Sequence, residues 1–182
     1  MPQFRKLEMD ELNRLSNEDF KSATKSRFSF VLDNVRSLQN VGSMFRTGDA
    51  FRIDSIFLCG ITGQPPHRDI QKTALGSTES VDWKYESDPC KLIDELKANG
   101  WLIIGIEQTE NSTMLDQFEF STTSKYAFVL GNEVNGVSQD VLEKCDTVLE
   151  IPQIGTKHSL NIAVSAGIIA WEYYSKTKGN TL

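Results

Sequence analysis

Residues 28–46 read FSFVLDNVRSLQNVGSMFR, a run that joins an apolar stretch to an amphipathic one. The first six residues are nearly continuously hydrophobic and rich in aromatic and branched side chains, which predicts a strand buried on both faces. Val41, Met44 and Phe45 then recur at helical spacing, which predicts a helix over about 40–52. This run therefore indicates a strand followed by a helix that packs on the same sheet.

The same alternation recurs along the whole chain. Further apolar runs predict strands at 55–60, 101–106, 126–131 and 147–151, with a weaker one at 81–85. Helical patterns occupy 89–99, 138–145 and 159–175. Strands of this kind alternating with helices are typical of an α/β fold, a mostly parallel sheet with helices on both faces. Because such sheets bind ligands beyond the carboxyl ends of their strands, functional residues are expected just after the strands.

The length of 182 residues, 39% of them hydrophobic, suits one domain with a short appendage. We expect a helical extension at 1–27, in which 7–24 shows two short helical patterns and Ser16 is a good N-cap. The main domain would cover 28–175, and 176–182 would be a frayed tail. The chain begins without the apolar block of a signal peptide and has no run long enough to span a membrane, so a cytoplasmic location is expected.

Cysteine and charge patterns narrow the function further. The three cysteines, Cys59, Cys90 and Cys145, form no C-x-x-C pair, so packed thiols are expected and no disulfide or metal site.

The net charge is −6, which at first argues against an RNA partner. However, residues 81–150 hold fourteen Asp or Glu against five Lys or Arg, a net of −9, which leaves +3 for the rest. The non-acidic remainder could hold RNA, although charge alone favours a surface that only keeps the protein in solution.

The segment after the first strand reads N-V-G-S-M-F-R over 40–46. Asn40 is a good helix N-cap, and Gly42 lets a ligand or another backbone approach closely. Arg46 follows less than two helical turns later, where its guanidinium could donate two hydrogen bonds to a phosphate. A cap followed by a surface salt bridge is the structural alternative.

The segment after the strand at 126–131 reads L-G-N-E-V-N-G over 130–136. Gly131 and Gly136 allow a sharp loop that turns backbone groups inward. Glu133, within that loop, could bind a cation, accept a hydrogen bond from a hydroxyl or cap a neighbouring helix. No Lys-Ser/Thr pair follows the second glycine, so this is not a phosphate-binding P-loop.

The segment after the last strand reads IPQIGTKHSLNIAV over 151–164. Gly155 gives a flexible loop, and Ser159 or Asn161 could begin the final helix. A serine N-cap on a core helix would explain Ser159 alone. It would not explain why Lys157, His158 and Asn161 lie at the start of the same helix. We therefore favour a functional site there.

Jointly, these three segments resemble the signature motifs of the SpoU (TrmH) group of SPOUT RNA 2′-O-ribose methyltransferases. The matching patterns are N-x-G-x-x-x-R at 40–46, L-G-N-E-x-x-G at 130–136 and I-P-x-x-G-x-x-x-S-L-N at 151–161. The similarity runs from about residue 28 to 175. It implies a fold whose C-terminal part threads a loop into a deep trefoil knot, an obligate homodimer, and S-adenosylmethionine bound largely by loop backbone. The implied cofactor contacts are Ile106, Leu130, Gly131, Ile151, Ser159 and Leu160.

The resemblance implies methyl transfer to a ribose 2′-hydroxyl in tRNA or rRNA, an in-line displacement that needs alignment and loss of the hydroxyl proton. Arg46 is the family's catalytic arginine. Because arginine stays protonated, holding a phosphate and stabilising the developing alkoxide is an easier role for it than that of general base. His158 is an alternative base. The other implied site residues are Asn40, which would orient Arg46 or the ribose, Glu133, which would anchor the site, and Ser159 and Asn161, which would donate hydrogen bonds.

Two other functions are compatible with parts of the pattern. One is a knotted RNA-binding or assembly factor without catalysis, which the complete set of motif residues disfavours. The other is a nucleotide-dependent oxidoreductase on a doubly wound sheet. No G-x-G-x-x-G follows the first strand, so the oxidoreductase is excluded.

Overall fold

The apolar runs of the sequence form one seven-stranded sheet in the computed structural model, which describes residues 4–177. Its strand order is β3-β2-β1-β6-β4-β7-β5, and every strand pair is parallel. The strands are β1 (Phe28–Asp33), β2 (Ile56–Cys59), β3 (Trp83–Glu86), β4 (Trp101–Ile106), β5 (Thr113–Met114), β6 (Lys125–Leu130) and β7 (Thr147–Glu150). The predicted α/β class is confirmed.

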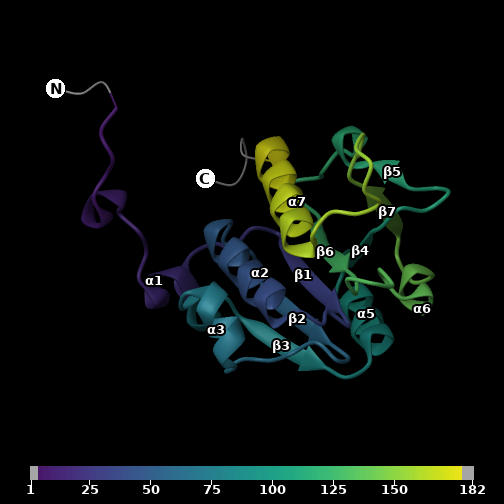
Figure 1. Cartoon of the computed structure of the whole chain (residues 1–182), viewed down its shortest axis with the longest axis horizontal. Coiled ribbons are helices and arrows are strands. Elements are labelled where there is room, and N and C mark those ends of the chain that lie inside the picture. Colours follow the sequence, from purple (N-terminus) through teal and green to yellow (C-terminus); the bar gives the residue numbers. More distant parts are fainter. Residues whose placement is uncertain (1–3, 178–182) are drawn as a thin grey trace.

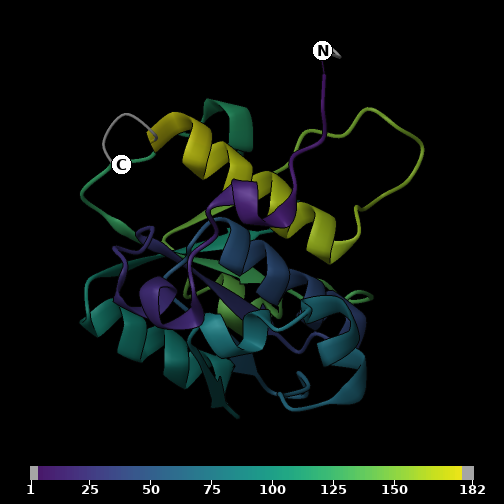
Figure 2. The same cartoon turned by 90° about the vertical axis from the view of Figure 1, so that its left-hand side faces the viewer.

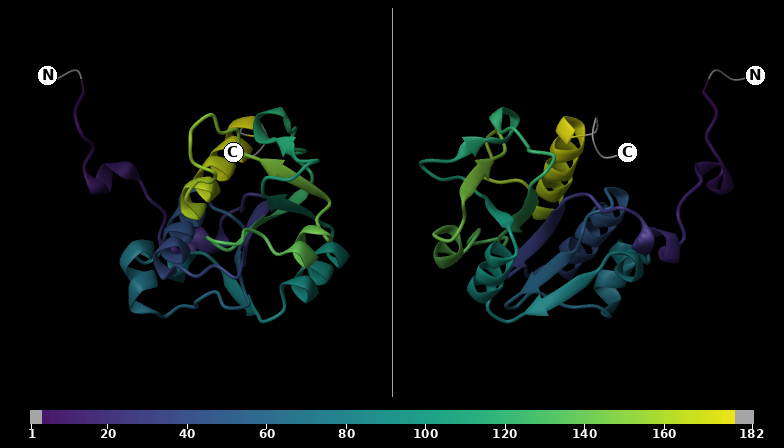
Figure 3. Two further views of the ribbon diagram at one scale, coloured as in Figure 1. Left: turned by 45° about the vertical axis from the view of Figure 1, so that its right-hand side comes forward. Right: turned by 180° about the vertical axis from the view of Figure 1, so that it is seen from behind.

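Helices cover both faces of this sheet (Figure 1). Those of the main domain are α2 (Leu38–Ala50), α3 (Arg68–Ala74), α4 (Ser77–Ser80), α5 (Pro89–Ala98), α6 (Gln139–Leu142) and α7 (Ile162–Thr177), with a 3-10 turn η2 (Leu115–Gln117). Figure 3 shows α2, α3 and α7 on one face and α5 and α6 on the other. The central strands are therefore buried on both sides, as their continuous hydrophobic runs predicted.

The core is split by the sheet into two layers, and the alternation of side chains along the central strands explains the division. In β1, Phe28, Phe30 and Leu32 join the layer under α2 and α7, whereas Val31 joins the layer under α5. In β6, Phe128 and Val129 divide in the same way. Both strands are fully buried apart from the first residue of β6.

The expected helix starts need two corrections. The helix predicted from residue 40 begins at Leu38, because Ser37 is its N-cap and accepts a hydrogen bond from the Asn40 backbone N–H at 3.2 Å. Asn40 therefore lies inside the first turn and is not the cap. The helix predicted over 159–175 begins at Ile162, after Asn161, and continues through Thr177. Residues 176 and 177 of the expected tail are thus helical, and the rest of it lies outside the described residues.

The strands agree closely with prediction, whereas three short elements were missed. Strands 28–33 and 101–106 are confirmed to the residue, and the remaining predicted strands differ by one or two residues at their ends. The elements α3, α4 and β5 were not predicted, because each is shorter than the window over which hydrophobic periodicity can be recognised. Gly42 permits the close packing of α3 on α2, since a Cβ there would collide with the Ile70 carbonyl and the Thr73 hydroxyl.

The N-terminal extension is only partly attached to the domain. It contains a 3-10 turn η1 (Met9–Leu12) and helix α1 (Asn17–Ser22), and Ser16 caps α1 as predicted, accepting from the Asp19 N–H at 3.1 Å. Phe20 of α1 is buried in the main core. In contrast, Figure 1 shows the segment before α1 extending away from the body, and in Figure 2, viewed from that side, the same segment lies in front of the body.

Candidate active site

A cleft of about 580 Å³ opens beyond the carboxyl ends of β4, β6 and β7, which are neighbours in the sheet. Three loops and the first turn of α7 form its walls. The lining residues are Ile106, Glu107, Gln108, Leu130, Gly131, Asn132, Glu133, Val134, Asn135, Gly136, Ile151, Gln153, His158, Ser159, Leu160, Asn161, Ile162 and Ser165. The structure thus brings the second and third sequence motifs together at one edge of the sheet.

The loop after β6 closes tightly at the mouth of this cleft. The backbone groups of Asn132 and Gly136 exchange two hydrogen bonds, each of 2.9 Å. A Cβ on Gly131 would run into the backbone of Gly136 and Val137, so only glycine fits at that position. Gly136 itself has a φ of +69°, in the left-handed region that favours glycine. The two glycines of the motif therefore shape the cleft wall.

Glu133 is held by backbone and side-chain donors at the start of α2. Its carboxylate accepts from the N–H groups of Arg36 and Ser37, both at 2.9 Å, and from Asn40 Nδ2 at 3.0 Å. Partial burial opposes ionisation, but these hydrogen bonds outweigh it and lower the pKa of Glu133 below its ordinary value. The carboxylate thus fixes the residues that lead into α2, whose N-cap is Ser37.

Asn161 extends the same network to the third motif. Its Nδ2 donates to Asn40 Oδ1 at 3.2 Å, while its Oδ1 accepts from the Ala163 N–H at 2.9 Å at the start of α7. Asn161 therefore acts as the cap of α7, as one of the two predicted alternatives proposed. The side chains of Glu133, Asn40 and Asn161 form one chain of hydrogen bonds that joins all three motifs.

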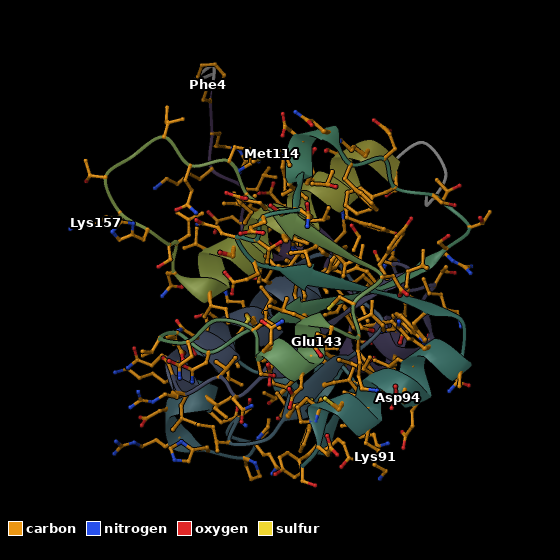
Figure 4. All side chains as sticks on the ribbon, turned by 90° about the vertical axis from the view of Figure 1, so that its right-hand side faces the viewer. Phe4, Lys91, Asp94, Met114, Glu143 and Lys157 are labelled. Atoms are coloured by element: carbon orange, nitrogen blue, oxygen red, sulfur yellow. The ribbon has the colours of Figure 1, made fainter. Side chains whose placement is uncertain are left out.

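Ser159 and His158 line the same cleft as Glu133, and no hydrogen bond within residues 4–177 fixes their side chains. Both are exposed, and within residues 4–177 neither the Ser159 hydroxyl nor the His158 imidazole is hydrogen-bonded to another residue. Both groups are thus free to meet a ligand. Figure 4 shows Lys157, the preceding residue, on a loop that projects away from the body.

Sequence reasoning missed two residues of the cleft, Glu107 and Gln108. Glu107 accepts from the Val137 N–H at 3.0 Å and so braces the loop after β6. Gln108 Nε2 donates to the His158 carbonyl at 2.8 Å, which ties the loop after β4 to the loop after β7. Their position directly after a strand was the available signal, since ligands bind at that end of parallel strands.

Arg46 does not line this cleft. Six residues separate it from Asn40, about 600° of helical rotation, so the two side chains leave α2 about 120° apart and point in different directions. Arg46 instead lines a second cleft, of about 380 Å³, beside α4. Within one chain, the structure separates Arg46 from Asn40, Glu133, Ser159 and Asn161, and Asn40 does not orient it.

Residues 4–177 contain neither a cluster of metal-binding side chains nor a membrane-spanning helix. In that range no group of three or more His, Cys, Asp or Glu side chains is placed to hold a metal ion. No helix there is long and apolar enough to cross a membrane. The residues that line the cleft present amides, hydroxyls, apolar side chains and backbone groups, together with the side chains of Glu107, Glu133 and His158.

The parallel sheet and the cleft beyond three adjacent strand ends define the class of protein: an α/β protein whose loops form a candidate binding cleft at the carboxyl edge of the sheet. Residues 27–171 match the model of the SpoU rRNA Methylase family, and the chain belongs to this family. The match includes all three motifs.

Individual relatives agree with that assignment. A Staphylococcus epidermidis protein named for the TrmH family of tRNA/rRNA methyltransferases is 32% identical over 158 residues, which cover 86% of this chain and 62% of the relative. The chain thus spans less than two thirds of that relative's length.

Solved structures share the fold. The SpoU methyltransferase AviRb of Streptomyces viridochromogenes, in complex with the cofactor AdoMet, aligns with a TM-score of 0.76 at 22% identity, covering 87% of this chain and 60% of AviRb. A structure described for 2-OH methylation of C/U34 on tRNA aligns with a TM-score of 0.74 at 23% identity, covering 84% of this chain and 97% of that one.

Proposed function

We propose that this protein transfers the methyl group of S-adenosylmethionine to a ribose 2′-hydroxyl in tRNA or rRNA. The observation that carries the proposal is the hydrogen-bonded chain of Glu133, Asn40 and Asn161, which joins the three family motifs around one cleft. Family membership supports methyl transfer, and the relatives named for tRNA/rRNA methyltransferases support an RNA substrate.

The cleft suits S-adenosylmethionine in size and chemistry. Its volume of about 580 Å³ lies within the usual range for small-molecule sites. Ile106, Leu130, Ile151 and Leu160 provide apolar walls, and the tight Gly131 loop provides backbone donors and acceptors. When bound, the cofactor supplies an electrophilic methyl group on a sulfonium. AviRb, which shares the fold, binds this cofactor.

The residues of this chain would align the reactants and handle one proton. The ribose oxygen forms a bond to the methyl carbon while the carbon–sulfur bond breaks, so the hydroxyl must lose its proton. Ser159 and Asn161 would hydrogen-bond substrate or cofactor, and Glu133 would anchor the site by holding Asn40, which in turn accepts from Asn161. His158, exposed at the same wall, is one group that could accept the proton.

Arg46 would act from a second copy of the chain. It lies outside its own copy's cleft, so it reaches a cofactor only if another subunit presents that cofactor to it. There its guanidinium would bind an RNA phosphate and stabilise the developing alkoxide. A homodimer is therefore part of the proposal.

The outer face of α7 supports such a dimer. Val164, Trp171 and Tyr174 are 51%, 59% and 37% exposed, and their spacing of seven and three places them on one side of the helix. A Cβ on Gly167 would meet nothing within 4 Å, so the face is open there as well. Large apolar side chains grouped on one helix face are typical of protein interfaces.

The trefoil knot implied by the family stays a prediction.

The competing function is an RNA-binding or assembly factor without catalysis. Arg46→Ala separates the two, because a variant that still complements loss of the gene would favour binding over chemistry. The direct test maps 2′-O-methyl sites in total RNA from a deletion strain and its parent. We expect at least one tRNA or rRNA site to lose its methyl group and to regain it with the wild-type gene. An unchanged map would contradict the proposal.

A further inference from the structure

The second cleft, around Arg46, has the features of a binding site in its own right. It occupies about 380 Å³ between α2, the α3–α4 turn and α1. Its lining residues include Asn17, Arg46, Asp49, Leu75, Glu79 and Ser80. Arg46 is the one cation among the residues that line it, all of which the structure describes. Its side chain is exposed and forms no hydrogen bond or ion pair with any other residue of 4–177.

The other polar groups of this cleft are already fixed in position. Asp49 accepts a hydrogen bond from the Ser80 hydroxyl at 2.5 Å, and Glu79 accepts one from Asn17 Nδ2 at 3.4 Å. Two carboxylates make the cleft a poor site for a bare phosphate. They are good acceptors, however, for the amino groups of a base or the hydroxyls of a ribose.

Asn17 reaches the cleft from the N-terminal extension. It lies outside residues 27–171, the part of the chain that matches the family model. The helix that carries it is nevertheless fixed to the domain, because Phe20 is buried in the main core and Asn17 itself is bonded to Glu79. This wall of the cleft is therefore an addition to the family domain that has a defined position.

We propose that this cleft binds one nucleotide of the RNA substrate. Arg46 donates two hydrogen bonds to the phosphate of this nucleotide. Asn17 and Glu79 form hydrogen bonds with the edge of its base or with its ribose hydroxyls. Leu75, 65% exposed, offers the apolar surface on which the base lies. Asn17 is then a specificity-determining residue supplied by the extension. This assignment rests on the proposed function, since it takes RNA as the substrate.

The test compares Asn17→Ala with Glu18→Ala, a neighbour on α1 that does not line the cleft. Each variant is assayed as the full chain for methyl transfer into RNA extracted from cells that lack the protein. We expect Asn17→Ala to raise the KM for RNA about fivefold, the effect of one neutral hydrogen bond, with the dissociation constant for S-adenosylmethionine unchanged. Glu18→Ala should match the wild type in both quantities.

Two results would overturn the assignment in distinguishable ways. Methyl transfer by the wild type together with an unaltered KM in both Asn17→Ala and Glu79→Gln would overturn the nucleotide cleft alone. If these variants instead weaken the dimer in sedimentation equilibrium with KM unchanged, the cleft belongs to a subunit contact. Absence of methyl transfer by the wild type into any of this RNA would remove the proposed function as well.

Discussion

Asn161 Nδ2 donates to Asn40 Oδ1 at 3.2 Å, which links side chains that are 121 positions apart in the sequence. The same Asn40 amide donates to Glu133, so it satisfies a donor and an acceptor from two different motifs. An aspartate or a leucine at position 40 would break at least one of these bonds. The family motifs are therefore joined by one side chain that must be an amide.

Removing both side chains of the Asn161–Asn40 hydrogen bond should lower the free energy of unfolding by less than the sum of the two single removals. We expect Asn40→Ala and Asn161→Ala each to destabilise the fold, with a coupling of about 0.5–1.5 kcal/mol in a double-mutant cycle. Urea unfolding measures the four free energies. Asn99→Ala, at the end of α5 on the other face of the sheet, is the control and should add to Asn40→Ala without coupling. Additive values for Asn40 and Asn161 would show that the bond is not formed in solution.

The lowered pKa of Glu133 predicts a pH dependence of stability. Burial raises this pKa, but the bonds from Arg36, Ser37 and Asn40 lower it more, so the folded state holds the proton less tightly than the unfolded state. The stabilising contribution is therefore fully present above the unfolded value of about 4.3 and is lost as the pH falls through the lower folded value. The difference in Tm between the wild type and Glu133→Gln should shrink as the pH is lowered from 7 towards 3. A difference that stays constant would argue against the carboxylate as the stabilising form.

Arg46→Ala should separate catalysis from cofactor binding. Because Arg46 lies outside the cofactor cleft of its own chain, we expect kcat to fall by roughly 100-fold or more while the affinity for S-adenosylmethionine is retained. Single-turnover methyl transfer and calorimetric titration measure the two quantities. Arg68→Ala is the matched control, since Arg68 is an exposed arginine on α3 that lines neither cleft. Loss of cofactor affinity in Arg46→Ala would place Arg46 in the cofactor site instead.

The thiols of Cys59 and Cys145 should be unreactive at neutral pH. Burial raises the pKa of Cys59 to about 12 and that of Cys145 to about 11, so both remain protonated, and thiols react as thiolates. Iodoacetamide at pH 7.5 should label them slowly in the folded protein and at the rate of a free thiol in urea. Rapid labelling of Cys59 in the folded protein would mean that β2 is not packed as described.

Much of the fold could be predicted because the central strands leave little ambiguity. Runs such as 28–33 and 101–106 are hydrophobic at nearly every position, which indicates burial on both faces and hence a parallel sheet. The start of α2 was harder to predict. Ser37 and Asn40 are both good caps, and the sequence alone does not show which of them lies outside the helix.

The candidate site was predicted in its parts more than in its arrangement. Motif spacing located Glu133, Asn161 and the two glycines after strand ends, where the structure brings them together. Six residues of helical rotation predict that Arg46 and Asn40 point in different directions, but not that Arg46 lines a second cleft, which only the packing of α1, α3 and α4 creates. Glu107 and Gln108 had no such motif, because their roles depend on loops that are distant in sequence.

The central claim is methyl transfer to a ribose 2′-hydroxyl, and one measurement tests it most directly. The purified protein is incubated with methyl-labelled S-adenosylmethionine and RNA from cells that lack the protein, and the digested nucleosides are separated by mass spectrometry. We expect label in a single kind of 2′-O-methylnucleoside from tRNA or rRNA. Label confined to a base, or no label in any nucleoside, would contradict it.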